Sequence, residues 1–191
     1  VARAMTQTLA GVTPTTMILL ENTAGSGQGL GMTFEELYAI REAIRPKRHV
    51  GICLDTAHLF AAGFPIHTEK GLEQVVASFD RIVGREHLKL IHLNDSKVPF
   101  DSRVDRHWHI GQGHIGLAAF RRIVNHPQLK DLPFILETPK RTDTEDLENL
   151  ATVRRLTRPV RSRPGSASLP VRRRGRAWGN GVPQEMACQP R

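Results

Sequence analysis

The chain has 191 residues, 39% of them hydrophobic, so it is long enough to bury a sizeable core and is not expected to be disordered as a whole. Its longest apolar runs fall far short of the roughly 20 residues that a membrane-spanning helix needs, and its N-terminus lacks a secretory signal pattern. Its two cysteines do not make a disulfide framework, so we expect a cytoplasmic setting and no membrane partner.

The net charge of +8 is concentrated at one end of the chain. Residues 158–191 hold eight of the 27 basic residues and one of the 19 acidic residues, so this segment carries +7 and the preceding residues carry +1. A basic tail binds polyanions weakly or not at all, so the charge does not identify a nucleic-acid-binding protein. The tail is rich in Arg, Pro, Gly and Ser without helical or strand period, which predicts disorder.

The first 157 residues alternate short aliphatic runs with longer segments of helical period, which is the pattern of βα units. Each aliphatic run is of the kind that is buried on both faces of a parallel sheet. These runs predict strands at residues 16–21, 50–55, 88–93 and 133–137.

A helix is predicted after each of these strands. Thr33 and Glu36 form a capping box for the first helix, which Pro46 ends. The second helix follows Thr68, and the third spans residues 117–125.

The fourth helix begins at a capping box of Thr142 and Glu145 and carries Leu147 and Leu150 as its apolar positions. Four βα units make half of a (β/α)₈ barrel, which needs about 250 residues when complete. The expected fold class is therefore α/β. Residues 1–157 would form about the last four βα units of a partial TIM barrel, and residues 158–191 a disordered basic tail.

In parallel α/β folds the ligand site lies at the carboxyl ends of the strands. Here those ends hold Glu21, Asp55, His92 and Glu137. A divalent cation would offset the desolvation of several carboxylates at once, and mixed oxygen and nitrogen ligands suit Zn²⁺, Mn²⁺ or Fe²⁺ better than Mg²⁺. The alternative is that each residue only caps or pairs with a neighbour, which carries less weight for four residues in register than for one.

A second ligand group is predicted in the loops beyond these ends, formed by His58, Asp105 and His107. Residues i and i+2 of an extended chain project to the same side, so Asp105 and His107 can bind one ion together. Three protein ligands with an open position describe a catalytic zinc site. An isolated Asp-x-His is more often a solvated loop, but its place directly after the third strand favours a ligand pair.

Two glycine-rich stretches, residues 25–29 and 111–113, could be mistaken for phosphate-binding loops. Neither has the Gly-Lys-Ser/Thr ending or the spacing of a dinucleotide-binding motif. We expect tight loops beneath the substrate that permit close backbone approach, without nucleotide binding.

Six segments resemble the signature segments of the endonuclease IV family and occur in the family's order. They are Leu-Leu-Glu-Asn-Thr-Ala-Gly (19–25), Cys-Leu-Asp-Thr-Ala-His (53–58), His-Leu-Asn-Asp-Ser-Lys (92–97), Ser-Arg-Val-Asp-Arg-His (102–107), Ile-Gly-x-Gly-x-Ile-Gly (110–116) and Leu-Glu-Thr-Pro (136–139). The resemblance covers residues 1 to about 157 and implies the C-terminal half of a xylose isomerase-like barrel. It also implies a zinc-dependent apurinic/apyrimidinic endonuclease of base excision repair, which hydrolyses the phosphodiester 5′ to an abasic site and leaves a 3′-hydroxyl and a 5′-deoxyribose phosphate.

The resemblance further implies three zinc ions in a complete site, with Mn²⁺ as a possible substitute. Glu21 would bridge two of them and, with Glu137, is a catalytic candidate, because Glu137 would orient the attacking hydroxide. Asp55, His92 and Glu137 would complete the second ion's ligands, and the three residues of the second group would hold the third ion. The family supplies two further histidines from its N-terminal half, so the first ion would keep only Glu21, and we expect this chain alone to show reduced or no activity.

The expected partner is double-stranded DNA that contains abasic sites, bound by a protein that is monomeric when full-length. Arg103, Arg106 and Lys97 lie beside the ligands and are candidates for DNA contact, although an exposed arginine is more often only solvated. Two alternatives remain open. One is a sugar isomerase or epimerase that uses one metal on the related barrel, and the other is a non-catalytic fragment.

Overall fold

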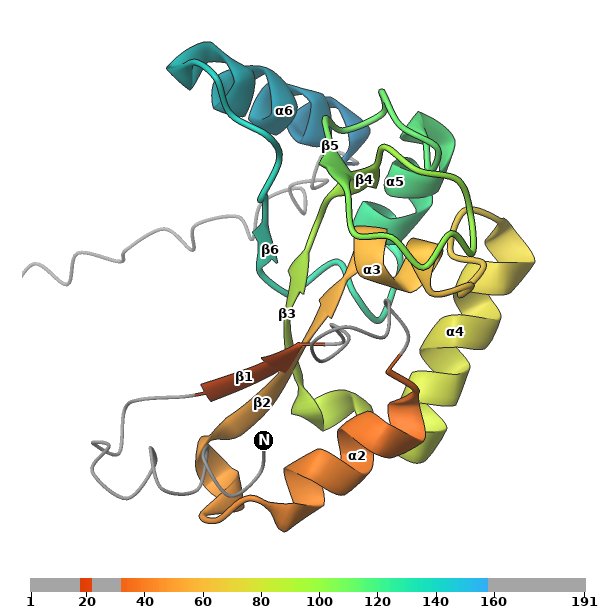
Figure 1. Cartoon of the computed structure of the whole chain (residues 1–191), viewed down its shortest axis with the longest axis vertical. Coiled ribbons are helices and arrows are strands. Elements are labelled where there is room, and N and C mark those ends of the chain that lie inside the picture. The colour runs from red at the N-terminus through yellow and green to blue at the C-terminus, as the bar shows by residue number, and fades with distance from the viewer. Residues whose placement is uncertain (1–17, 22–31, 158–191) are drawn as a thin grey trace, which may run out of the picture. The chain divides into compact units, whose positions relative to one another are not determined.

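The structure is a computed structural model that describes residues 18–21 and 32–157 (Figure 1). The predicted tail at 158–191, the first residues of the first predicted strand and the glycine-rich stretch 25–29 lie outside the described residues. Among the described helices, none combines the length and apolarity needed to cross a membrane.

A parallel sheet organises the described residues. Its strands lie side by side in chain order: β1 (Ile18–Glu21), β2 (Val50–Asp55), β3 (Leu88–His92) and β6 (Phe134–Ile135). This is the arrangement expected of consecutive βα units, so the predicted α/β partial barrel is confirmed. β6 is shorter than predicted, because residues beyond Ile135 leave the sheet.

A second, two-stranded antiparallel sheet was not predicted. It pairs β4 (Asp95–Ser96) with β5 (His107–Trp108) directly beyond the end of β3. Its strands are too short to give a recognisable sequence period, so only the paired structure reveals them.

The pairing of β2 with β3 contains one irregularity. Ile52 pairs with Leu88, whereas Cys53 pairs with Leu90, so β3 holds one extra residue at this point. Because successive side chains on a strand point to opposite faces, the register after this irregularity decides which side chains are neighbours. It places Asp55 opposite His92.

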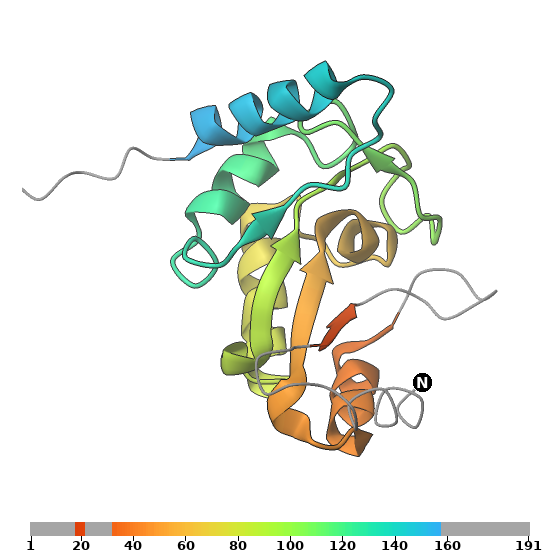
Figure 2. The same cartoon turned by 90° about the vertical axis from the view of Figure 1, so that its left-hand side faces the viewer.

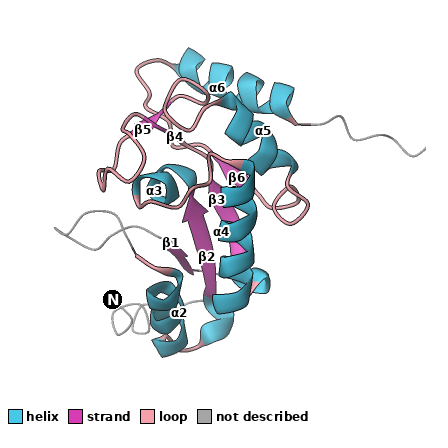
Figure 3. Cartoon of the chain, turned by 90° about the vertical axis from the view of Figure 1, so that its right-hand side faces the viewer, coloured by secondary structure: helices cyan, strands magenta, loops and turns pink. Residues whose placement is uncertain are grey.

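Helices α2 (Phe34–Ala43), α4 (Glu69–Ile82) and α5 (Leu117–Asn125) lie along one side of the parallel sheet (Figures 1 and 3). Figure 2 shows the sheet from the opposite side, with the strands in front of these helices. The hydrophobic core includes residues from both layers, among them Ile52, Leu54, Leu72, Phe79, Ile91, Phe120 and Ile123. One-turn 3₁₀ helices, η1 (Lys47–His49) and η2 (Arg85–His87), precede β2 and β3.

Side-chain caps begin the helices where the sequence predicts them. Thr33 Oγ1 accepts the Glu36 N–H at 3.2 Å, and the Glu36 carboxylate accepts the Thr33 N–H at 2.8 Å. Thr68 Oγ1 accepts the Gly71 N–H at 3.0 Å at the start of α4. The predicted capping boxes and the second helix are therefore confirmed.

The fourth predicted helix, α6 (Asp143–Leu156), buries a different face from the predicted one. Leu147 and Leu150 are 66% and 41% exposed, whereas Asn149 and Leu156 are buried. Asn149 Oδ1 accepts the N–H of Ile110 at 2.8 Å, so a polar contact fixes this helix. The prediction was wrong because a search for apolar positions passes over a buried amide.

Candidate metal centre

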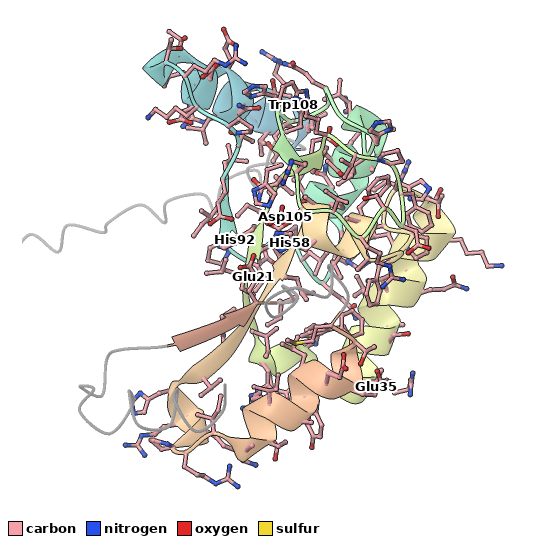
Figure 4. The ribbon with its side chains drawn as sticks, viewed as in Figure 1. Glu21, Glu35, His58, His92, Asp105 and Trp108 are labelled. Atoms are coloured by element: carbon pink, nitrogen blue, oxygen red, sulfur yellow. The ribbon has the colours of Figure 1, made fainter. Side chains whose placement is uncertain are left out.

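Four side chains gather where the parallel strands end. Glu21, Asp55 and His92 are the last residues of β1, β2 and β3, and Glu137 follows β6 by two positions. Figure 4 shows Glu21 and His92 close together at this end of the sheet. The strand order therefore brings together residues that are far apart in the sequence.

The imidazole of His92 faces three carboxylates. Its Nδ1 lies 2.8 Å from Glu21 Oε1, 3.0 Å from Glu137 Oε2 and 3.9 Å from Asp55 Oδ2. One ligand atom from each of these four residues lies within 4.8 Å of the others. One imidazole cannot balance three carboxylates, so this four-residue group carries an excess of negative charge that a divalent cation would offset.

Asp55 is the most deeply buried of these ligands, with 0% exposure. Burial raises the pKa of its carboxyl above the ordinary value, and the neighbouring His58 and His107 rings oppose this shift. Asp55 Oδ1 accepts the His58 N–H at 2.9 Å, and Oδ2 accepts from Asn94 Nδ2 at 2.7 Å. A cation beside Oδ2 would favour the ionised carboxylate in spite of its burial.

A three-residue group formed by His58, Asp105 and His107 lies beside the four-residue group, and Figure 4 shows His58 next to Asp105. The Nε2 atoms of His58 and His107 are 3.1 Å apart. Asp105 Oδ2 lies 3.3 Å from His58 Nε2, and its Oδ1 lies 3.4 Å from His107 Nε2. Asp105 and His107 thus both contact His58 Nε2, from the segment that leads into β5.

The sequence predicts a loop at His58, but this residue lies in a helix. It belongs to α3 (Thr56–Ala61), a short helix directly after β2, and its exposure is only 3%. Asp55 is the N-cap of this helix. The loop prediction was wrong because a helix of six residues is too short to show an apolar period.

The donors of the three-residue group, two imidazole nitrogens and a carboxylate, suit a divalent transition-metal ion such as zinc. Asp105 approaches the two rings with different oxygens, at 3.3 and 3.4 Å. His107 Nδ1 lies 3.2 Å from the Glu137 carbonyl oxygen, so a ring protonated at Nδ1 donates there and presents Nε2 to a metal.

A cysteine lies close to the four-residue group. Cys53 pairs with Glu21 in the β1–β2 register, and its Sγ could share an ion with Glu21 and His92. Burial raises the pKa of the Cys53 thiol to about 12, and the Glu21 carboxylate adds to this shift. Metals bind the thiolate, so Cys53 would act as a ligand only if the bound cation itself lowered the pKa of the thiol.

Asp95 is a buried residue to which the sequence analysis gave no role. Its carboxylate accepts four backbone N–H groups: Oδ1 from Ser96 and Ile115 at 2.8 and 2.9 Å, and Oδ2 from Gly111 and Gly113 at 2.9 and 3.0 Å. The glycine-rich stretch 111–113 therefore closes on a carboxylate of its own chain. A Cβ on Gly113 would lie 2.3 Å from the Ser96 carbonyl oxygen, which explains the glycine.

Asn94 is the second residue that sequence reasoning missed, and it is 0% exposed. Its amide contacts both Asp55 and Glu137. Asn94 and Asp95 belong to the segment 92–97, which resembles a family signature, and this resemblance was the signal that could have identified them.

The three candidates for DNA contact are exposed, and they lie close to the ligands in the sequence. Lys97 Nζ stands 4.2 Å from the centre of the Trp108 ring, a cation–π contact. Arg103 Nε donates to Asp101 at 2.9 Å, and Arg106 donates to the Asp105 carbonyl at 2.7 Å. All three cationic groups are therefore at the surface with contacts inside the chain.

Comparison with known proteins agrees with this architecture. The profile of the xylose isomerase-like TIM barrel family matches residues 3–158. A Chloroflexus aurantiacus protein named probable endonuclease 4 is 52% identical over 158 residues, which cover 82% of this chain and 55% of the relative. A Caenorhabditis elegans protein named apurinic-apyrimidinic endonuclease is 47% identical over 131 residues, which cover 69% of this chain and 33% of the relative.

A solved structure shows the same arrangement. The crystal structure of endonuclease IV from Thermus thermophilus superposes with a TM-score of 0.65 at 42% identity, covering 78% of this chain and 52% of that one. The chain spans about half the length of the bacterial relatives that it matches. By its profile, its strand order and its relatives, the chain belongs to the xylose isomerase-like TIM barrel family and, within it, to the endonuclease IV group.

Proposed function

We propose that this chain contributes part of the metal centre of a zinc-dependent apurinic/apyrimidinic endonuclease of base excision repair. The observation that carries the proposal is the four-residue group at the ends of the parallel strands, with the three-residue group in contact beside it. Asp55 connects the two, because its carboxylate, His58 and His107 also offer ligand atoms within 4.8 Å of one another. Relatives named endonuclease 4 and apurinic-apyrimidinic endonuclease support the reaction class. The substrate would be double-stranded DNA with an abasic site, cut 5′ to that site to leave a 3′-hydroxyl and a 5′-deoxyribose phosphate.

The positions of the seven candidate ligands favour a division between separate ions. Asp55, His92 and Glu137, with Glu21 as a bridge to a further ion, would hold one zinc ion. The three-residue group would hold another. Bound zinc ions would supply positive charge for the phosphate oxygens and a water of lowered pKa.

The chain's own side chains would orient the reacting groups. Within the four-residue group, Glu137 has the most exposed carboxylate, with 43% side-chain exposure against 29% for Glu21 and 0% for Asp55. It would accept a hydrogen bond from the attacking water and fix its direction. Glu21, at 29% side-chain exposure, would supply a further carboxylate ligand at this end of the sheet.

Substrate selection would follow from the cost of exposing a nucleotide. An abasic nucleotide has lost its stacking partner, so turning it out of the duplex costs less than turning out an intact one. Lys97, Arg103 and Arg106 are exposed near the ligands and would contact backbone phosphates, which position the duplex without reading its sequence.

The second ligand group argues against a sugar isomerase or epimerase. Isomerase chemistry on the related barrel needs the ion of the four-residue group alone. His58, Asp105 and His107 would then have no role, although their ligand atoms lie 3.1–3.4 Å apart.

Incision of a defined substrate tests the proposal. The substrate is a labelled duplex with one tetrahydrofuran abasic analogue, and the matched control is the same duplex without the lesion. Because the relatives are about twice as long, the chain is assayed alone and fused behind the matching N-terminal segment of the Chloroflexus relative. We expect zinc-dependent incision by the fusion, much weaker incision by the chain alone, and a product that a DNA polymerase can extend.

Two variants of the fusion sharpen the test. Glu137→Gln, assayed with zinc in excess, should lower the turnover number, because it removes the carboxylate that would ligate the metal and orient the water. Glu148→Gln changes an exposed glutamate of α6 and should act like the parent. A folded, zinc-loaded fusion that leaves the abasic duplex intact would show that the proposal is wrong.

A further inference from the structure

The side chain of Asn94 joins two members of the four-residue group. Its Nδ2 donates to Asp55 Oδ2 at 2.7 Å, and its Oδ1 accepts the Glu137 N–H at 2.7 Å. Both ends of the amide are therefore used, and the side chain has 0% exposure. Turning the amide over would set an oxygen against a carboxylate and an NH₂ group against an N–H, so its orientation is fixed.

The main chain of Asn94 is held as firmly as its side chain. Thr56, the residue after Asp55, donates from Oγ1 to the Asn94 carbonyl oxygen at 2.6 Å. The same Oγ1 accepts the Asn94 N–H at 2.8 Å. Asn94 thus links the end of β2 to the segment that follows β6, across the end of β3.

The oxygen that Asn94 contacts is the one that faces the ligands. Asp55 Oδ2 lies 3.9 Å from His92 Nδ1 and 3.6 Å from His107 Nε2. The other oxygen, Oδ1, is already bonded to the His58 N–H. The bond from Asn94 uses one lone pair of Oδ2 and directs another toward the ligand cluster.

We infer that Asn94 is a positioning residue of the metal centre, which holds Asp55 Oδ2 and the main chain of Glu137 so that both carboxylates face the same cation as His92. The inference rests on the proposed function, because it assumes that the four-residue group binds a metal. Both ends of the Asn94 amide are taken up by Asp55 and Glu137, so it would act through these two residues rather than as a ligand.

Two substitutions separate positioning from plain electrostatics. Asn94→Ala removes both hydrogen bonds. Asn94→Asp keeps the shape and the bond to Glu137 but replaces the donor to Asp55 by a carboxylate oxygen. An electrostatic account predicts that the added negative charge tightens zinc binding, whereas a positioning role predicts weaker binding for both variants.

Zinc affinity is measured by competition with a chromophoric chelator, so the readout does not depend on activity. The substitutions are made in a His107→Ala background, in which the four-residue group is the intended zinc site. Loss of a residue that orients metal ligands typically lowers affinity about 10–100-fold, and we expect this loss for both Asn94 variants.

Asn125→Asp is the matched control. Asn125 Nδ2 donates to the carbonyl oxygens of Arg121 and Leu156 at 2.7 and 2.9 Å, away from the ligands, so the same chemical change should leave zinc affinity unaltered. Far-UV circular dichroism of the zinc-free proteins establishes folding. If the alanine variant does not fold, the near-isosteric aspartate variant still gives the answer.

The outcomes distinguish the two claims. If the unsubstituted chain takes up no zinc, the proposed function fails. If it takes up zinc and Asn94→Asp binds as tightly or more tightly, the positioning role alone is wrong. Weaker binding by the Asn94 variants, with the Asn125 control unchanged, supports the inference.

Discussion

Replacing Asp95 by asparagine should destabilise the protein strongly, although it exchanges only one carboxylate oxygen for an NH₂ group. The Asp95 carboxylate accepts four backbone N–H groups, two on each oxygen. In the Asp95→Asn variant, whichever way the new amide turns, its NH₂ group faces two of these donors. Two charge-assisted bonds are lost, each worth about 1.5–3 kcal/mol, so we expect the free energy of unfolding to fall by roughly 3–6 kcal/mol.

Urea unfolding of the zinc-free protein, followed by circular dichroism, measures this change. Asp131→Asn is the control, because Asp131 has 83% side-chain exposure and only a surface pair with Lys130, worth at most about 1 kcal/mol. A loss below about 1 kcal/mol for Asp95→Asn would refute the reasoning, because it would mean that the four bonds contribute no more than a surface ion pair.

Four further outcomes are expected. Gly113→Ala should lower the free energy of unfolding by roughly 1–3 kcal/mol, because its Cβ would lie 2.3 Å from a carbonyl oxygen; an unchanged urea midpoint would contradict this. Thr68→Ala removes the N-cap of α4 and should cost about 1 kcal/mol in the same assay. In a Cys188→Ser background, native Cys53 should resist iodoacetamide at a pH near 8, because burial raises its thiol pKa to about 12 and keeps the thiol protonated. Mass spectrometry measures the alkylation, and rapid alkylation would contradict this expectation. Zinc should raise the melting temperature and excess chelator should reverse the rise, because the unfolded chain lacks a formed site; identical melting curves would count against the metal centre.

Features set by neighbouring residues were predictable from the sequence. The Thr33–Glu36 and Thr142–Glu145 boxes act within one turn, so three residues of spacing suffice to place the helix starts. The ends of β1 and β2 at Glu21 and Asp55 were predictable as well, since an apolar run that stops at an ionisable residue is a local pattern, whereas β6 ends before its predicted end. The chemistry of the candidate site followed, because parallel strands bring their carboxyl ends to one edge.

Features set by distant partners were not predictable in this way. Asn94 bonds to residues 39 and 43 positions away, so its place in the segment 92–97 does not reveal which residues it contacts. Asp95 is similar, with partners up to 20 positions ahead. His58 was assigned to a loop because the helix that holds it is capped by Asp55, a residue already interpreted as a strand end.

The extra residue in β3 decides which strand-end residues are neighbours. If β2 and β3 stayed in regular register from the Ile52–Leu88 pair onward, Asp55 would lie opposite Ile91, and His92 would lie one place beyond it. The irregularity removes this offset, so the carboxylate and the imidazole end their strands level with each other. A change that made the pairing regular without shortening β3 could therefore keep the composition of the core and still separate two candidate ligands.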